Sequence, residues 1–161
     1  MIFLGIDPGT RRMGYGLVSK VGRETTLVDA GIIKINSKDD LGALLEIKRG
    51  VSELVAKNKP ALVAIEKLFF AKNQKTALQV AEARGVALVS CLESGAKILE
   101  LSPNEVKMGL TGFGSADKKA VLKMVRLILK EPQLEVIDDA SDALALAILA
   151  AGRTNEIKGN L

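Results

Sequence analysis

The chain has 161 residues, 48% of them hydrophobic, and a formal charge of +4, because 23 lysines and arginines outnumber 19 acids. This size supports one hydrophobic core and a lone cysteine excludes an internal disulfide, so we predict a single domain over residues 1–152 and a short polar tail over 153–161. No apolar stretch reaches the roughly 20 residues of a membrane-spanning helix, and Asp7 interrupts the apolar start before it could act as a signal peptide, so we expect a cytoplasmic protein.

The N-terminal part of the chain is predicted to form three strands. Residues 2–6 are a β-prone run that ends in an Asp-Pro-Gly turn, and strand composition returns at 14–19 and at 25–35. Because only short turns separate these runs, we predict an antiparallel meander.

Helices and strands alternate in the middle of the chain. Apolar residues recur at helical spacing from 41 to 55, and Pro60 stops this helix before a fourth strand at 61–65. A long helix is predicted at 76–93, followed by a fifth strand at 97–101.

Three helices are predicted after the fifth strand. Residues 102–105, Ser-Pro-Asn-Glu, combine a capping residue, a proline and an acid in the order that starts a helix. Gly109 and the later glycines 112 and 114 are expected to break this short helix into a loop. Longer helices follow at 116–129 and 138–151.

The predicted order βββαβαβααα indicates an α/β fold. We expect a five-stranded mixed sheet, in which three antiparallel strands are followed by two parallel ones. Helices are expected on both faces.

Four carboxylates lie at the ends of predicted elements. Asp7 follows the first strand, Glu66 follows the fourth, and Asp139 and Asp142 share one face of the last helix. Acids gathered at one point repel a phosphodiester and a basic chain attracts one, so a divalent metal between carboxylate and phosphate reconciles the two features. Because the chain has no histidine, the pattern predicts a nuclease that uses Mg²⁺.

Each of these acids also has a purely structural explanation. Asp-Pro-Gly is an ordinary turn, and an acid at a strand end can simply be solvated. Asp138, Asp139 and Asp142, near the start of a helix, favour its dipole. Spacing alone also leaves open whether Asp138 or Asp139 accompanies Asp142.

Several blocks, in order, resemble the RuvC family of Holliday-junction resolvases from about residue 2 to residue 151. They are Leu-Gly-Ile-Asp-Pro-Gly-Thr-Arg-Arg-Met-Gly-Tyr-Gly from position 4, Ala-Ile-Glu-Lys-Leu-Phe-Phe-Ala-Lys-Asn from 64, Ala-Arg-Gly from 83, Gly-Ser from 114 and Asp-Ala-Ser-Asp-Ala-Leu-Ala from 139. The resemblance implies an RNase H-like fold and a homodimer that makes paired, symmetric nicks in four-way DNA junctions. The expected products are 5′-phosphate and 3′-hydroxyl ends.

The resemblance also implies which residues act. It selects Asp7, Glu66, Asp139 and Asp142 as the catalytic ligands of two Mg²⁺ ions, for which Mn²⁺ can substitute, and leaves Asp138 as the helix cap. The family is accompanied by a junction-binding tetramer of the RuvA type and a hexameric branch-migration ATPase of the RuvB type, so we expect both as partners.

Basic and aromatic residues supply candidate DNA contacts. Lys107 and Lys118 match family positions near the scissile phosphate, although either could be a solvated helix lysine. Phe69, close to Lys72, matches an aromatic that stacks on unpaired bases, although it could instead cover the core. Lys72 is a candidate DNA contact as a cation beside that aromatic, and the candidate contacts to backbone phosphates are Arg11, Arg12 and Arg84.

Two other functions fit parts of the sequence. The segment Gly-Ile-Asp-Pro-Gly-Thr from position 5 resembles the first phosphate loop of actin-like ATPases, but those enzymes need two such domains around the nucleotide. A non-catalytic junction-binding module would keep the basic surface without needing all four acids. The complete set of acids favours the nuclease.

Overall fold

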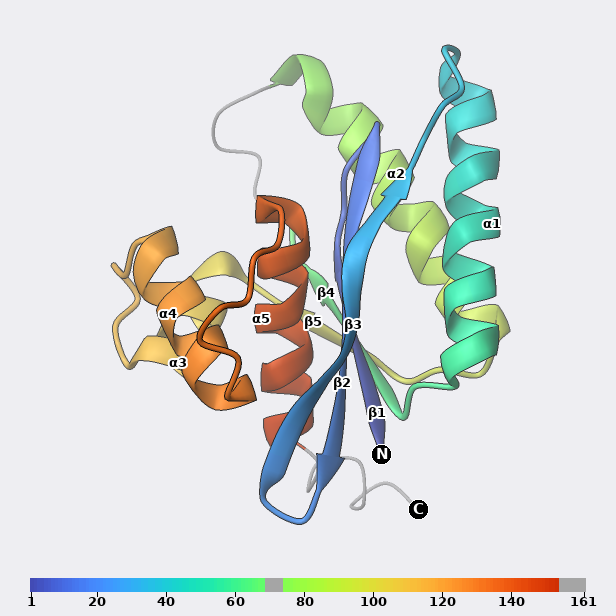
Figure 1. Ribbon diagram of the computed structural model, residues 1–161. Coiled ribbons are helices and arrows are strands. Elements are labelled where there is room, and N and C mark those ends of the chain that lie inside the picture. Colours follow the sequence, from blue (N-terminus) through green and yellow to red (C-terminus); the bar gives the residue numbers. More distant parts are fainter. Residues whose placement is uncertain (69–73, 154–161) are drawn as a thin grey trace.

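A computed structural model describes residues 1–68 and 74–153, which are built around a five-stranded sheet (Figure 1). β1 and β2 pair antiparallel, as do β2 and β3, whereas β4 runs parallel to β1 and β5 parallel to β4. The predicted mixed sheet is therefore confirmed. In spatial order, the strands are β3 (Glu24–Lys34), β2 (Arg12–Val21), β1 (Ile2–Asp7), β4 (Leu62–Glu66) and β5 (Ile98–Leu101).

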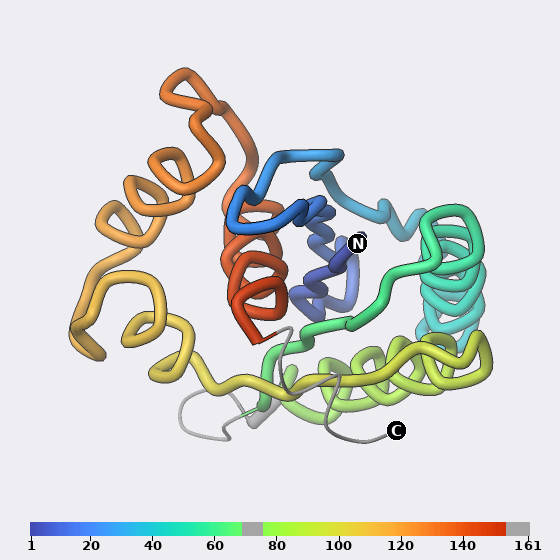
Figure 2. Tube along the Cα trace, turned by 90° about the horizontal axis from the view of Figure 1, so that it is seen from below, coloured from blue at the N-terminus to red at the C-terminus, as the bar shows by residue number. Residues whose placement is uncertain are grey.

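Helices cover both faces of the sheet (Figures 1 and 2). Two of them pack together on one face, one lies directly against the other face, and two more lie outside that one. No helix in the described part of the chain is long and apolar enough to cross a bilayer. In the same order, the helices are α1 (Asp40–Asn58) with α2 (Gln74–Glu93), α5 (Asp138–Gly152), and α3 (Pro103–Thr111) with α4 (Lys118–Leu129).

The alternation of side chains along β1 and β4 divides them between two cores. Phe3 on β1 and Ala64 on β4 pack with α4 and α5, whereas Leu4 on β1 packs with α1 and α2. Because successive residues of a strand point to opposite faces, Asp7 continues the set of Phe3 and Glu66 continues the set of Ala64. Both acids therefore lie on the α5 side of the sheet.

α5 approaches the sheet closely because positions beneath it are glycines, of which Gly5 and Gly14 lie nearest the acids. A Cβ on Gly5 of β1 would overlap the carbonyl oxygen of Ala143, and a Cβ on Gly14 of β2 would overlap the carbonyl oxygen of Asp139. Gly14 is the partner of Asp7 in the β1–β2 ladder. The missing side chain at Gly14 thus lets the first turn of α5 lie beside Asp7.

α3 differs from its prediction. Its start is confirmed, because the Ser102 side chain and the Glu105 carboxylate form a reciprocal capping box. Gly109 does not break the helix, which continues to Thr111 and ends at Gly112, where φ is 78°. The prediction was wrong because one glycine inside a helix costs only about 1 kcal/mol, which the packing of α3 on α5 can offset.

Candidate active site

Asp7 and Glu66 end neighbouring parallel strands at one edge of the sheet. β1 and β4 are in register as far as Ile6 and Ile65, so the two acids are the next residues on the two strands. Their side chains share a hydrogen bond. Two carboxyl groups can make such a bond only while one of them is protonated, which agrees in direction with the raised pKa of Asp7.

The N-terminal end of α5 adds the two predicted aspartates to this pair. Asp139 and Asp142 both act on Asp7 by charge repulsion. Their side chains are 25% and 35% exposed, against 61% for Asp138. The structure thus brings together the four predicted acids and leaves Asp138 at the rim. We call this set the acidic cluster: Asp7, Glu66, Asp139 and Asp142.

Asp138 does not cap α5, contrary to prediction. Ile137 occupies the cap position without a side-chain hydrogen bond, and Asp138 is the first residue of the helix. Its carboxylate instead forms an ion pair with Lys118 at the start of α4. Asp138 thus has a charged partner on another helix. The sequence gives no signal of this pairing.

The environment of Asp7 disfavours its charged form. Burial raises the pKa of Asp7 to about 8, and repulsion from Glu66, Asp142 and Asp139 acts in the same direction. A carboxyl group with this pKa keeps its proton at neutral pH unless positive charge enters the cluster. A divalent cation would supply that charge.

Burial is also the largest cause that raises the pKa values of Glu66 and Asp142. The hydrogen bond with Asp7 opposes the increase at Glu66, and the hydrogen bond from Lys118 opposes it at Asp142. Lys118 Nζ lies 3.0 Å from Asp142 Oδ2. Partial burial acts to lower the pKa of Lys118, but its bonds to Asp138 and Asp142 outweigh this and raise it.

Asp139 has an oxygen suited to a cation. Arg12 Nε lies 2.6 Å from Asp139 Oδ2, which makes an ion pair. Among the described residues that buried oxygen still has no hydrogen bond of acceptable geometry. An under-coordinated buried oxygen within a set of four carboxylates fits a hard divalent ion such as Mg²⁺ or Mn²⁺.

The side chains are not yet arranged around an ion. Within residues 1–68 and 74–153, no three acidic or cysteine side chains form a ready-made metal site. Arg12 and Lys118 instead neutralise Asp139 and Asp142. Metal binding at these two carboxylates would require the basic side chains to release them, which rotation of side chains can provide because the backbone elements already converge.

A cavity of about 220 Å³ opens beside the acidic cluster. Glu66 and Asp142 line it together with Lys107 of α3 and Lys118 of α4. Both predicted lysines therefore reach the same hollow as two of the acids. Apolar side chains complete the lining, namely Pro103, Val106, Val121 and Leu146.

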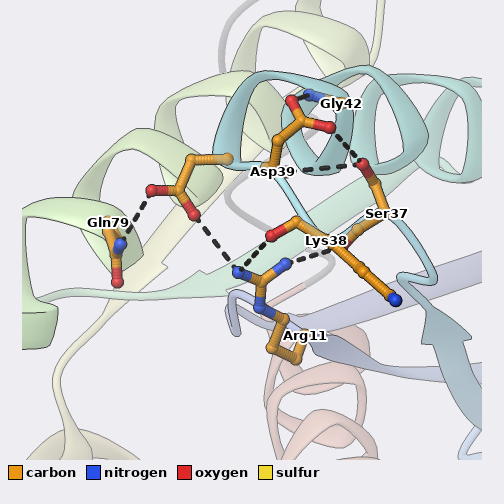
Figure 3. Close-up of polar contacts among 7 residues, drawn as sticks. Arg11, Ser37, Lys38, Asp39, Gly42 and Gln79 are labelled. Atoms are coloured by element: carbon orange, nitrogen blue, oxygen red, sulfur yellow. Dashed lines mark hydrogen bonds and ion pairs between the residues drawn. The ribbon is translucent and has the colours of Figure 1, made fainter.

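Arg11, a predicted phosphate contact, binds protein groups at the start of α1 (Figure 3). Its guanidinium group donates to the carbonyl oxygens of Ser37 at 2.7 Å and Lys38 at 3.4 Å, and to Asp40 at 3.2 Å. Gln79 of α2 holds the other oxygen of Asp40 at 3.0 Å. Arg11 thus binds the start of α1, which Asp40 in turn connects to α2, and a phosphate would have to compete with these partners.

The structure describes some of the other predicted DNA contacts and not others. Arg12 pairs with Asp139, and Arg84 donates to the backbone carbonyl of Glu66 at 2.8 Å. Phe69 and Lys72 lie outside the described residues. Phosphate or base contacts by all these side chains stay predictions.

The closeness of α5 to the sheet was missed, although the sequence carried a signal for it. Gly5 on the first strand, and Gly14 and Gly16 on the second, all lie beneath α5. Glycines at alternating positions of a strand indicate that another backbone approaches that face. The pairing of Arg12 with Asp139 had no comparable signal.

Comparison with known proteins finds relatives along nearly the whole chain. A family model described as crossover junction endodeoxyribonuclease RuvC matches residues 3–150. A protein of that name from Geobacter sp. (strain M21) is 42% identical over 163 residues, which is 99% of each chain. The Thermus thermophilus RuvC structure superposes with a TM-score of 0.88 and 31% identity over 97% of this chain and 96% of that one. T. thermophilus RuvC in complex with Holliday junction substrate gives a TM-score of 0.87 and 30% identity over 99% and 96%.

Fold and comparisons together define an RNase H-like nuclease, as the resemblance in the sequence implied. The chain belongs to the RuvC family of crossover junction endodeoxyribonucleases. The family match includes the Asp-Pro-Gly-Thr segment on which the ATPase alternative depended, so that segment is part of the nuclease domain.

Proposed function

We propose that this chain resolves four-way DNA junctions in recombination and repair, by cutting one phosphodiester bond in each of two strands. The main support for this proposal is that the acidic cluster converges at one edge of the sheet, beside a cavity lined by two lysines. A solved relative bound to a Holliday junction supports the same substrate class. We further propose that residues 1–152 act as one nuclease domain.

The four carboxylates of the acidic cluster are the proposed ligands of two Mg²⁺ ions, with Mn²⁺ as a substitute. Bound metal would activate a water molecule and stabilise charge on the phosphate oxygens. The all-oxygen donor set and the unsatisfied Oδ2 of Asp139 support this assignment.

The side chains around the cluster prepare the site for hydrolysis. Positive charge in the cluster would favour the deprotonated forms of Asp7 and Glu66, whose pKa values are raised without it, and both carboxylates could then act as ligands. Lys118 moves from Asp142 to the substrate phosphate, and Lys107 faces the same cavity. Their positive charge offsets the charge that develops on the leaving 3′ oxygen, so the products carry 5′-phosphate and 3′-hydroxyl ends.

The remaining DNA contacts are proposed from the resemblance. Phe69 would stack on a base exposed at the junction, with Lys72 beside it. Arg11 and Arg12 are candidates for backbone phosphates, each in exchange for its present protein partner.

We also propose that the active form is a homodimer. Paired cuts need two sites, and one chain of this length carries one acidic cluster. α2 exposes Leu78, Val89 and Leu92 along one side of the helix, with Gly85 between them. This apolar stripe supports α2 as part of the dimer contact. Partners of the RuvA and RuvB types, and a cytoplasmic location, are proposed on family grounds.

The proposed function is tested with a synthetic four-way junction and a linear duplex that contains the same arm sequences. Each is incubated with the purified protein in Mg²⁺ or in EDTA. We expect paired nicks in the junction alone, only with Mg²⁺, and products that DNA ligase can rejoin. Equal cutting of the duplex, or cutting in EDTA, would reject the proposal. Binding without any cutting would favour the non-catalytic module instead.

A further inference from the structure

Arg84 is a largely buried arginine beside the strand end that carries Glu66. Its side chain is 15% exposed, and its Nε donates to the backbone carbonyl of Glu66 at 2.8 Å. A terminal nitrogen of the same group forms an ion pair with Glu100 on β5. One guanidinium group thus connects α2, β4 and β5. Its planar, fixed set of donors sets direction as well as charge, which a lysine cannot reproduce.

The bond to Glu66 lies where the pairing of β4 comes to an end. The ladder with β1 stops at Ile65, one residue before Glu66. On the other side, Glu66 is level with Leu101, the last residue of β5, whose carbonyl accepts from the Lys67 amide at 2.8 Å. Arg84 therefore adds a side-chain restraint at the one residue of β4 that belongs to the acidic cluster.

Arg84 acts on Glu66 through the backbone and not through the carboxylate. The charges that influence the Glu66 carboxyl group are those of Asp142 and Lys118. Replacing Arg84 should therefore move the Glu66 carboxylate without removing a charge partner from it. The low exposure of Arg84 and its pairing with Glu100 also leave little of the group available to a DNA phosphate.

We propose that Arg84 is a positioning residue for the cleavage reaction, oriented by Glu100 and holding the end of β4 so that Glu66 faces its fellow ligands. The inference rests on the function proposed above, because it gives Glu66 a place among metal ligands. It replaces the phosphate contact that the sequence suggested for Arg84.

The test compares Arg84→Lys, Arg84→Gln and Glu100→Gln with Arg49→Lys, a matched control at an exposed arginine of α1. Four quantities are measured: the cleavage rate at saturating junction, the junction Kd in EDTA, the binding of Mn²⁺ to the DNA-free protein by calorimetry, and the unfolding midpoint. Both Arg84 variants should lose about 10- to 100-fold in cleavage rate and in Mn²⁺ affinity, as partners of metal ligands typically do. Their junction Kd should not change. Glu100→Gln should show a smaller loss of the same kind, and Arg49→Lys none.

Three results would overturn the inference. Full cleavage rate and full Mn²⁺ affinity in Arg84→Lys would show that charge alone is enough. A weakened junction Kd in Arg84→Gln with unchanged Mn²⁺ affinity would make Arg84 a DNA contact. If the Arg84 variants do not fold, unchanged rate and Mn²⁺ affinity in Glu100→Gln would be decisive against it. A wild-type protein that binds Mn²⁺ but does not cut junctions would refute the proposed function. The Mn²⁺ affinities of wild type and the Arg84 variants would still test the role of Arg84.

Discussion

Asp7 lies in surroundings that oppose its own charge. It is buried, hydrogen-bonded to Glu66 and repelled by three neighbouring acids, which raises its pKa to about 8. Arg12 and Lys118 neutralise two of those acids, and no basic side chain among the described residues does so for Asp7. The end of β1 therefore has no compensating positive charge among the described residues. For this reason, replacing a single acid of the cluster should have a measurable effect.

The first prediction concerns the pH dependence of stability without metal. Because the folded pKa of Asp7 is raised from 3.8 to about 8, its contribution to stability is present at low pH and is lost as pH rises through about 8. Asp7→Asn removes this loss, so near pH 8 the variant should be more stable than wild type by about 1–3 kcal/mol. Thermal or urea unfolding in EDTA between pH 5 and pH 9 measures the difference.

Asp39 provides the control for this measurement. Its pKa is lowered, first by the hydrogen bond from the Gly42 amide, so it titrates below the range tested. Asp39→Asn should leave the pH slope as it is in wild type. Parallel slopes for Asp7→Asn and wild type would contradict the first prediction.

The second prediction separates chemistry from DNA binding. Asp142→Asn should lower junction cleavage by at least about 100-fold, since loss of a proposed ligand exceeds the 10- to 100-fold effect of losing a ligand's partner. Binding in EDTA should be unchanged or tighter, because one negative charge facing the DNA is gone. Asp138→Asn is the matched control: it shares Lys118 but lies at the rim, and should keep most of the activity. Equal losses in the two variants would contradict the ligand assignment.

At the scale of elements, the packing of α5 on the sheet determines where Asp139 and Asp142 lie. α5 is covered by the sheet on one side and by α3 and α4 on the other, so nearly all of its residues are small or apolar. The aspartates are confined to its N-terminal end, where the helix emerges beside the ends of β1 and β4. A change in the height of α5 above the sheet must therefore move two of the four acids together.

The third prediction tests this dependence with Gly14→Ala. The new methyl group would overlap the Asp139 carbonyl oxygen, so the first turn of α5 has to lift from β2. We expect a loss of about 1–3 kcal/mol in the free energy of unfolding, as in other overpacked sites, together with a large loss of cleavage. Gly152→Ala, at the far end of α5 where nothing lies within 4 Å, is the control and should preserve both. A stable, fully active Gly14→Ala protein would show that α5 can shift without consequence.

At the scale of the whole molecule, the acidic cluster and the apolar stripe of α2 lie on different sides of the sheet. α5 covers one face with the acidic cluster at its start, whereas α1 and α2 cover the other (Figure 1). A groove between α1 and α2, lined in part by Leu44, Val86 and Val89, continues the stripe. Pairing of two chains through this face would leave each acidic cluster open to DNA.

The fourth prediction is that Val89→Glu produces monomers. A two-fold contact would bring two glutamates into an apolar interface, where unpaired charge is costly. Light scattering should show the mass of one chain, and junctions should be nicked singly instead of in pairs. Leu127→Glu, at a more exposed apolar position on α4, should remain dimeric. A Val89→Glu dimer with normal paired cutting would place the contact on another surface.

The sequence by itself determined the order of the elements and the identity of the clustered acids. Strand alternation, helical spacing and capping residues such as Ser102 act within a few positions of chain, so they can be read locally. Asp7 and Glu66 were recognisable as strand-end acids, and the family blocks distinguished Asp139 from Asp138. Such features depend on local geometry or on a motif, and neither requires knowledge of distant contacts.

Only the tertiary structure decided how these residues are held and neutralised. Gly109 stays helical because α3 packs on α5, and Asp138 binds Lys118 instead of capping its own helix. Arg84 reaches the backbone of Glu66. Arg12 contacts Asp139, although the two residues lie near opposite ends of the sequence. Partners of this kind come from elements far apart in the chain. Which side chains meet depends on how α5 and α2 pack on the sheet, and local sequence patterns do not contain that information.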